Sequence, residues 1–210
     1  MIGLNYLGKM GQLGNQMFQY AALKGIARNR GLDYIVPKHS DAIQDGLGNT
    51  LRIELFEPFN IESKYYGFIE TKEYIQEAHF HFDEDLYNNC PDNSSLYGFF
   101  QSPKYFLNIR DEIIKDFKFK KEIIDECKPI LKQFDYPIGL HIRRGDFLIN
   151  SANHHNLPMS YYENGLIVLM MIDKLLFFLT ILSGALNRNY LMMIDSLYHN
   201  QIVHIMIYIS

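Results

Sequence analysis

The arginine-rich stretch at 141–146, His-Ile-Arg-Arg-Gly-Asp, holds the residues of this chain best suited to chemistry. It follows an apolar run at 136–140 that predicts a buried strand. Arginine binds phosphate through a planar, permanently charged fork that donates paired hydrogen bonds. In open α/β sheets, ligands lie just beyond the carboxyl ends of the strands, where Arg143 and Arg144 would stand. The stretch therefore predicts a site for a doubly charged phosphate group, and a solvated surface turn is the alternative interpretation.

A glycine-rich turn near the N-terminus is the second candidate site. An apolar run at 2–7 precedes Gly8, Gly11 and Gly14, and apolar residues at helical spacing follow from residue 15. This order predicts a strand, a glycine loop and a helix. Such a loop brings backbone N–H groups and a helix N-terminus toward an anion or a sugar hydroxyl. The glycine spacing matches neither the dinucleotide fingerprint nor the lysine-bearing phosphate loop, and a tight turn without a ligand is the alternative.

Four blocks of sequence resemble the bacterial α-1,2-fucosyltransferases of glycosyltransferase family 11. The block at 11–21 is similar to the opening signature of that family, and the block at 96–106 to its mid-chain segment. The stretch 141–146 resembles its first sugar-nucleotide motif, which is shared with α-1,6- and protein O-fucosyltransferases, and 157–162 resembles the segment that follows. The four blocks occur in the family's order.

The resemblance implies a fold and a domain organisation. It implies an α/β glycosyltransferase of the GT-B type, with two Rossmann-type domains and a donor site in the cleft between them. The N-terminal domain would occupy residues 1–135, and the GDP-sugar-binding domain would begin at 136–165 and remain incomplete. Residues 166–210 would form an atypical apolar tail.

The resemblance also implies a reaction. Members of the family transfer L-fucose from GDP-fucose to the 2-hydroxyl of a terminal galactose in surface glycan synthesis, with inversion and without a metal or other cofactor. Arg143, with Arg144 second, would stabilise the charge that develops on the β-phosphate of the leaving GDP. Asp146 is the nearest candidate for the catalytic base, although a structural salt bridge to one of the arginines is an equal alternative.

Further residues are expected to bind the substrates. His141 would orient the phosphate or the arginine, and the Gly14 backbone with Asn15 and Gln16 would face the sugar from the first domain. The partners expected are GDP-fucose and a galactose-terminated glycan.

The elements that must position these residues alternate along the chain. The pattern predicts a helix over 15–29 that ends at Arg30-Gly31, a strand at 33–36 and a polar loop over 38–60. A second helical region begins at Ser102, and a third runs from Lys120 to about residue 134 with one apolar face. Alternating strands and helices predict an α/β fold with a largely parallel sheet.

Composition excludes several classes of function. A chain of 210 residues with 48% hydrophobic residues can bury one good core or two small ones. A net charge of −4 without a Lys/Arg run argues against nucleic acid as a partner.

Cys90 and Cys127 are isolated and are expected to be reduced thiols of a cytoplasmic protein that lacks a signal peptide. His79 and His81 alternate with phenylalanines, and a metal site there would need a further ligand.

The last 45 residues, 166–210, differ from the rest. They hold 17 Leu or Ile but only four Asp, Lys or Arg, which does not suit an amphipathic βαβ pattern. One interpretation is a membrane span over 166–182, which Asp173 and Lys174 oppose, and another is peripheral association with the inner face of a membrane. The favoured interpretation is a change of reading frame just after Glu163. Alternative-frame recoding of the tail, with permitted codons, gives segments similar to later family motifs.

Two functions therefore remain open from the sequence. One is an active α-1,2-fucosyltransferase. The other is an inactive, frame-disrupted remnant that keeps only part of the donor site.

Overall fold

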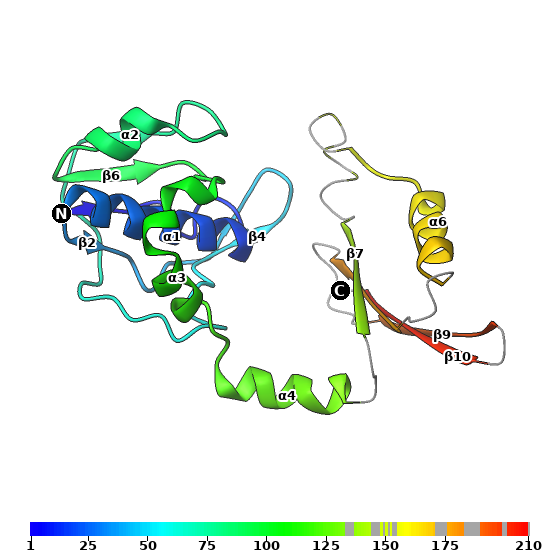
Figure 1. Ribbon diagram of the computed structural model, residues 1–210. Coiled ribbons are helices and arrows are strands. Elements are labelled where there is room, and N and C mark those ends of the chain that lie inside the picture. The colour runs from blue at the N-terminus through cyan, green and yellow to red at the C-terminus, as the bar shows by residue number, and fades with distance from the viewer. Residues whose placement is uncertain are drawn as a thin grey trace. The chain divides into compact units, whose positions relative to one another are not determined.

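The computed structural model describes residues 1–132, 137–143, 148, 150, 152, 155–170, 176–182, 190–198 and 201–209. The chain divides into two compact units. Unit 1 comprises residues 1–43 and 50–124, and unit 2 comprises residues 44–49 and 125–210. Each is an α/β unit with parallel strand pairs, as the sequence predicted (Figure 1).

Unit 1 is built on a four-stranded parallel sheet with the order β2-β1-β6-β5. Its strands are short: β1 (Ile2–Gly3), β2 (Tyr34–Ile35), β5 (Tyr74–Gln76) and β6 (Ser94–Tyr97). The strand predicted at 2–7 ends early because the Asn5 amide turns to the backbone of Ile69. Asn5 Nδ2 donates to Ile69 O and Asn5 Oδ1 accepts from Ile69 N, each at 2.9 Å.

Helix α1 (Leu13–Arg30) confirms the helix predicted over 15–29. Tyr20, Leu23 and Ile26 are fully buried on it, and their apolar area removed from water is the main stabilising term. The helix ends at Gly31, whose left-handed conformation (φ 65°) lets its N–H bond Arg28 O. Gly31 therefore stops the helix where the sequence predicted.

The chain between residues 38 and 131 also forms shorter helices and a two-stranded sheet. Helix α2 (Glu84–Asn89) is capped by Asp83, whose carboxylate accepts from Leu86 N at 2.9 Å. The helical region predicted from Ser102 consists of η1 (Pro103–Tyr105), η2 (Leu107–Ile109) and α3 (Arg110–Asp116). The polar stretch 38–60 also contains two short paired strands, β3 (Ile43–Gln44) and β4 (Thr50–Leu51). Helix α4 (Lys121–Leu131) spans the boundary between the units and confirms the third predicted helix.

Unit 2 contains a second four-stranded sheet with the order β7-β8-β10-β9. Strand β7 (Pro137–Arg143) confirms the strand predicted before the arginines and extends three residues beyond Leu140. Helix α6 (Met159–Met170) lies between β7 and β8 (Leu176–Leu182) in sequence, and these two strands are parallel. Strand β10 (Gln201–Ile209) is parallel to β8 and antiparallel to β9 (Tyr190–Tyr198).

The composition of residues 166–210 did not suit an amphipathic βαβ pattern, and the backbone nevertheless forms strands in this segment. The segment from β7 through α6 to β8 has that pattern, and β9 and β10 extend the same sheet. Continuous apolar runs are typical of strands that are buried on both faces, so the absence of alternation did not exclude strands. Within the apolar stretch 166–182, residues 166–170 belong to α6 and residues 176–182 to β8. None of the described helices has the length and hydropathy that crossing a membrane requires.

Candidate active site

The first candidate site lies at the carboxyl edge of the sheet in unit 1. Strands β1 and β6 are adjacent and parallel, so the chain leaves both of them at this edge. The loop after β1 is the glycine-rich turn, and the turn after β6 begins at Gly98. The blocks at 11–21 and 96–106, far apart in sequence, therefore meet where ligands of open α/β sheets bind.

Two glycines of the loop adopt the conformation that glycine favours. Gly8 (φ +79°) and Gly11 (φ +72°) are both in the left-handed region. A Cβ on Gly8 would lie 2.6 Å from the backbone nitrogen of Ile53, and one on Gly11 would lie 2.6 Å from Asn15 Cβ. The loop is thus pressed against the chain at Ile53 and against the first turn of α1, and a larger residue at either glycine would displace it.

The buried side chain of Gln16 holds this loop in place through hydrogen bonds. Its side chain is fully buried, its Nε2 donates to Arg52 O (2.8 Å) and Gly11 O (3.3 Å), and its Oε1 accepts from Glu54 N (2.9 Å) and Leu55 N (3.2 Å). Every polar atom of the amide is therefore bound to backbone. The sequence placed Gln16 among the substrate-binding residues, and in the structure its side chain is buried with its amide bound to the backbone of the loop and of residues 52–55.

Gly14 and Asn15 form the open side of the turn. A Cβ added at Gly14 would meet no atom within 4 Å, so space lies before the first turn of α1. Leu13 N donates to Glu54 Oε2 at 3.2 Å, whereas the Gly14 and Asn15 N–H groups have no acceptor within the described part of the chain. Free N–H groups at a helix N-terminus suit an anion or a sugar oxygen.

Gln101 connects the two turns, and the sequence did not single it out. Its Nε2 donates to Asn15 Oδ1 at 2.6 Å. The Asn15 amide oxygen is therefore occupied within the protein, and the amide nitrogen lies against the loop, where a Cβ on Gly11 would overlap it. The block at 96–106 contained Gln101, but nothing in its residue type distinguished it from its neighbours.

Glu77 and Gln19 hold the turn that carries Gln101. Glu77 Oε2 accepts from Phe99 N (2.8 Å) and Phe100 N (3.0 Å), and this fixes Phe100 in a left-handed conformation (φ 52°). Gln19 Nε2 donates to Gly98 O at 2.8 Å and to Met10 O at 3.4 Å. One oxygen of each of these two side chains, Glu77 Oε1 and Gln19 Oε1, is buried without a hydrogen-bond partner.

The second candidate site, the arginine motif, begins at the carboxyl end of β7. His141 and Arg143 are in the last three residues of that strand, and Arg143 is in register with Leu182 of β8. The backbone therefore places Arg143 at the edge where the sequence predicted it. Arg144 and Asp146 lie outside the described residues.

The profile of the family described as Glycosyl transferase family 11 matches residues 1–166. This is most of the chain and includes both candidate sites. The chain belongs to glycosyl transferase family 11.

Curated relatives of this family 11 chain support the assignment. The O-antigen biosynthesis glycosyltransferase WbnK of Escherichia coli is 27% identical over 198 residues, covering 74% of this chain and 65% of WbnK. Galactoside alpha-(1,2)-fucosyltransferase 2 of Mus musculus is 26% identical over 157 residues, covering 70% of this chain and 42% of its own length. Galactoside alpha-(1,2)-fucosyltransferase 1 of Sus scrofa is 28% identical over 149 residues, covering 66% of this chain and 38% of its own length.

These matches span less than two thirds of the relatives' own lengths. No solved structure matches the family 11 chain significantly.

An ion cluster on α1 supports the fold of this family 11 chain without entering its site. Lys24 Nζ and the Tyr20 hydroxyl both donate to Asp116 Oδ2, at 2.6 and 3.0 Å. Burial lowers the pKa of Lys24, but the hydrogen bond to Asp116 and the charge of that carboxylate outweigh burial and raise the pKa overall. Burial, aided by Tyr34 and Asp116, raises the pKa of Tyr20, so its hydroxyl remains a donor.

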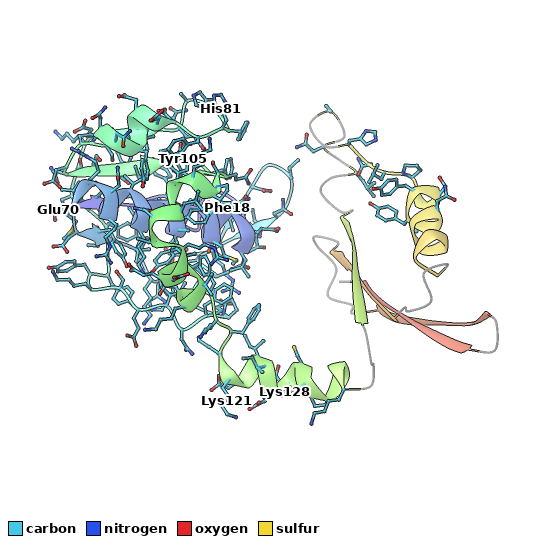
Figure 2. The ribbon with its side chains drawn as sticks, in the orientation of Figure 1. Phe18, Glu70, His81, Tyr105, Lys121 and Lys128 are labelled. Carbon is cyan, nitrogen blue, oxygen red and sulfur yellow. The ribbon has the colours of Figure 1, made fainter. Side chains whose placement is uncertain are left out.

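The alternating histidines form a stacked pair on the surface. The rings of His79 and His81 are parallel, with centroids 3.4 Å apart, and His81 lies in the segment that leads into α2 (Figure 2). Within the described residues, no three His, Cys, Asp or Glu side chains gather as a metal site requires. Both cysteines are free, with Cys90 buried and Cys127 exposed.

Proposed function

We propose that this family 11 chain is a galactoside α-1,2-fucosyltransferase, which transfers L-fucose from GDP-fucose to the 2-hydroxyl of a terminal galactose with inversion. The observation that carries the proposal is the meeting of two family blocks at one sheet edge, joined by the hydrogen bond from Gln101 to Asn15. The relatives named as galactoside alpha-(1,2)-fucosyltransferases support the choice of reaction. WbnK, which is named for O-antigen biosynthesis, supports a role in surface glycan synthesis.

The proposed reaction is a single displacement. The 2-hydroxyl of galactose attacks the anomeric carbon of fucose while the bond from that carbon to the β-phosphate oxygen breaks. GDP leaves with the bonding electron pair, and the hydroxyl proton passes to a carboxylate or to water. Attack from the face opposite the leaving group inverts the anomeric centre.

The leaving phosphate needs positive charge, and no metal is expected to supply it. Arg143 would stabilise the β-phosphate with a bidentate fork, Arg144 would assist, and His141 would orient one of them. The free N–H groups at Gly14 and Asn15 would bind sugar oxygens from unit 1. Asp146 is a candidate for the base, and an ion pair with an arginine remains the alternative for it. In this proposal the two units are the halves of a GT-B enzyme.

A transfer assay tests this function. The purified chain, GDP-fucose and a β-galactoside are incubated with and without EDTA, and the product is analysed by mass spectrometry and NMR. We expect a fucosyl α-1,2-galactoside in both conditions. A product at another hydroxyl, or a strict requirement for Mg²⁺ or Mn²⁺, would contradict the proposal.

A frame-disrupted remnant is the second candidate, and one observation favours it. The family profile ends at residue 166, close to the position where the sequence changes character after Glu163. The nucleotide sequence around codon 163 tests this alternative. Family-like sequence in a neighbouring frame would support it, and its absence from both neighbouring frames would contradict it.

A further inference from the structure

A cavity of about 330 Å³ in unit 1 is separate from the glycine-rich turn. Its size falls at the lower end of small-ligand pockets. The residues that line it include Lys38, Phe56, Glu62, Tyr66 and Lys120.

The lining includes residues that follow β2, the neighbour of β1 in the sheet of unit 1. Lys38 comes three residues after β2, which is parallel to β1, and Tyr66 pairs with Val36 in a parallel bridge. Phe56 directly follows Leu55, whose N–H donates to Gln16 Oε1 at 3.2 Å. A molecule in the cavity would therefore lie beside Leu55, which Gln16 links by hydrogen bonds to the glycine-rich turn at Gly11.

The two lysines give the cavity an unbalanced positive charge. Lys120 Nζ donates to Phe56 O at 2.7 Å, and Lys38 Nζ lies 5.0 Å from the centroid of the Tyr66 ring. Throughout the described part of the chain, no carboxylate lies within ion-pair distance of either ammonium, although Glu62 lines the same cavity. An ammonium carries three donors, so Lys120 retains two for a ligand.

The other walls of the cavity suit a sugar. Phe56 and Tyr66 are packed edge to face with centroids 6.0 Å apart, and the Tyr66 side chain is exposed. Aromatic faces pack against the C–H surface of a pyranose ring, while the hydroxyl groups of that ring need polar partners at the rim. Apolar walls with a few placed charges are typical of selective ligand sites.

We propose that this cavity binds the acceptor saccharide and that Lys38 and Lys120 select an acceptor with a carboxylate on the sugar next to galactose. The inference rests on the proposed function, because that function supplies the galactoside. An acidic surface glycan is the substrate class that this charge recognises.

Binding to the purified chain tests the inference without turnover. The probes are a β-galactosyl-glucuronate disaccharide and neutral lactose, measured by calorimetry at low and high salt. We expect the acidic disaccharide to bind roughly fivefold more tightly, since partly exposed charge pairs contribute modestly, and the difference to vanish in about 0.5 M NaCl.

Lysine variants test whether the preference for the acidic disaccharide comes from the cavity. Lys38→Gln and Lys120→Gln should each reduce the preference for the acidic disaccharide, and Lys38→Gln removes no hydrogen bond within the described residues. Lys64→Gln is the control, because Lys64 Nζ also lies over a tyrosine ring, 4.7 Å from the centroid of Tyr65, but is outside the cavity and is paired with Asp33 at 3.3 Å. It should leave the preference unchanged.

Several results would overturn the inference. One is equal binding of the two disaccharides, and another is binding of neither. A third is a loss of the preference for the acidic disaccharide in Lys64→Gln as large as in the two cavity variants. The fourth is displacement of the acidic disaccharide by inorganic phosphate at a similar concentration. Failure of the proposed function would appear elsewhere, as absence of fucosyl transfer to a neutral galactoside. Transfer to lactose without a preference for the acidic disaccharide would overturn this inference alone.

Discussion

Gln101 Nε2 donates to Asn15 Oδ1 at 2.6 Å, and this hydrogen bond joins two segments that are 86 residues apart. It holds the turn after β6 against the first turn of α1. The Asn15 amide oxygen is thereby occupied, and we propose that the amide nitrogen donates to a ligand. In the proposed reaction that ligand is a sugar oxygen.

A double-mutant cycle measures this relationship. Asn15→Ala and Gln101→Ala should each destabilise unit 1 slightly, and the pair should show a coupling free energy of about 1 kcal/mol in urea unfolding. Both variants should also lower fucosyl transfer. Strictly additive effects on unfolding would show that the hydrogen bond contributes nothing.

Substitutions at two glycines of α1, Gly14 and Gly25, distinguish effects on stability from effects on substrate binding. Gly14→Ala should raise the free energy of unfolding by about 0.5–1 kcal/mol, because alanine is a better helix former and its Cβ meets no atom within 4 Å. The added methyl group would nevertheless obstruct the helix N-terminus and lower transfer.

Gly25→Ala is the contrasting variant. Its Cβ would overlap Tyr105 O and lie 2.8 Å from Phe106 Cα, where Tyr105 is packed beside α1 (Figure 2). We expect a loss of about 3 kcal/mol, measured by thermal or urea unfolding. A stable Gly25→Ala variant would contradict the close approach of η1 to α1, and normal transfer by Gly14→Ala would contradict the site.

Acid stability depends partly on Glu112. Burial raises the pKa of this carboxyl, but hydrogen bonds from Arg28 and the charge of Lys24 outweigh burial and lower the pKa from 4.5. A lowered pKa means that the folded state gains stability above pH 4.5 and loses it as the pH falls through the folded-state value. Glu112→Gln should therefore flatten the loss of stability below pH 4.5.

The effect of Glu112→Gln should be small. Its side chain is 43% exposed, so solvent screening limits the cost at pH 7 to about 1 kcal/mol or less. Asp111→Asn is the control, because the Asp111 side chain is 96% exposed. Urea unfolding from pH 3 to 7 compares them, and a steeper acid loss in Glu112→Gln would show that the sign is wrong.

The two thiols should differ in reactivity. Burial raises the pKa of Cys90, which outweighs the hydrogen bond with Ser94, and the thiolate is the reactive form. Cys127 is exposed on α4. A thiol reagent should label Cys127 rapidly in the native protein and Cys90 only after unit 1 unfolds. Cys127→Ser should abolish the rapid phase, and rapid labelling of Cys90 would contradict the burial of β6 and α2.

Local signals predicted much of the fold. The strand, glycine loop and helix at the N-terminus, the stop of α1 at Gly31 and the strand before Arg143 follow from short-range patterns. The secondary structure of residues 166–210 could not be predicted in this way, because a continuous apolar run is compatible with a buried strand as well as with a helix.

The candidate site was predicted only in part. Gly14 and Asn15 were proposed from their block and stay a prediction, whereas the hydrogen bonds of Gln16, Gln101 and Glu77 were not predicted. Each of these side chains binds a partner between 22 and 86 residues away, so the contact exists only after the sheet has formed. Residue type alone does not distinguish such an amide or carboxylate from one that is solvated.

Fucosyl transfer by Arg143 variants tests the central claim most directly. GDP-fucose and a β-galactoside are incubated with the purified chain, Arg143→Ala and Arg143→Lys, and the product is measured by mass spectrometry. The wild-type chain should form fucosyl-galactoside, and Arg143→Ala should be slower by on the order of a hundredfold or more. Arg143→Lys should recover little, since an ammonium cannot form the bidentate contact. Wild-type rates in Arg143→Ala, with product formed from GDP-fucose, would contradict the assignment.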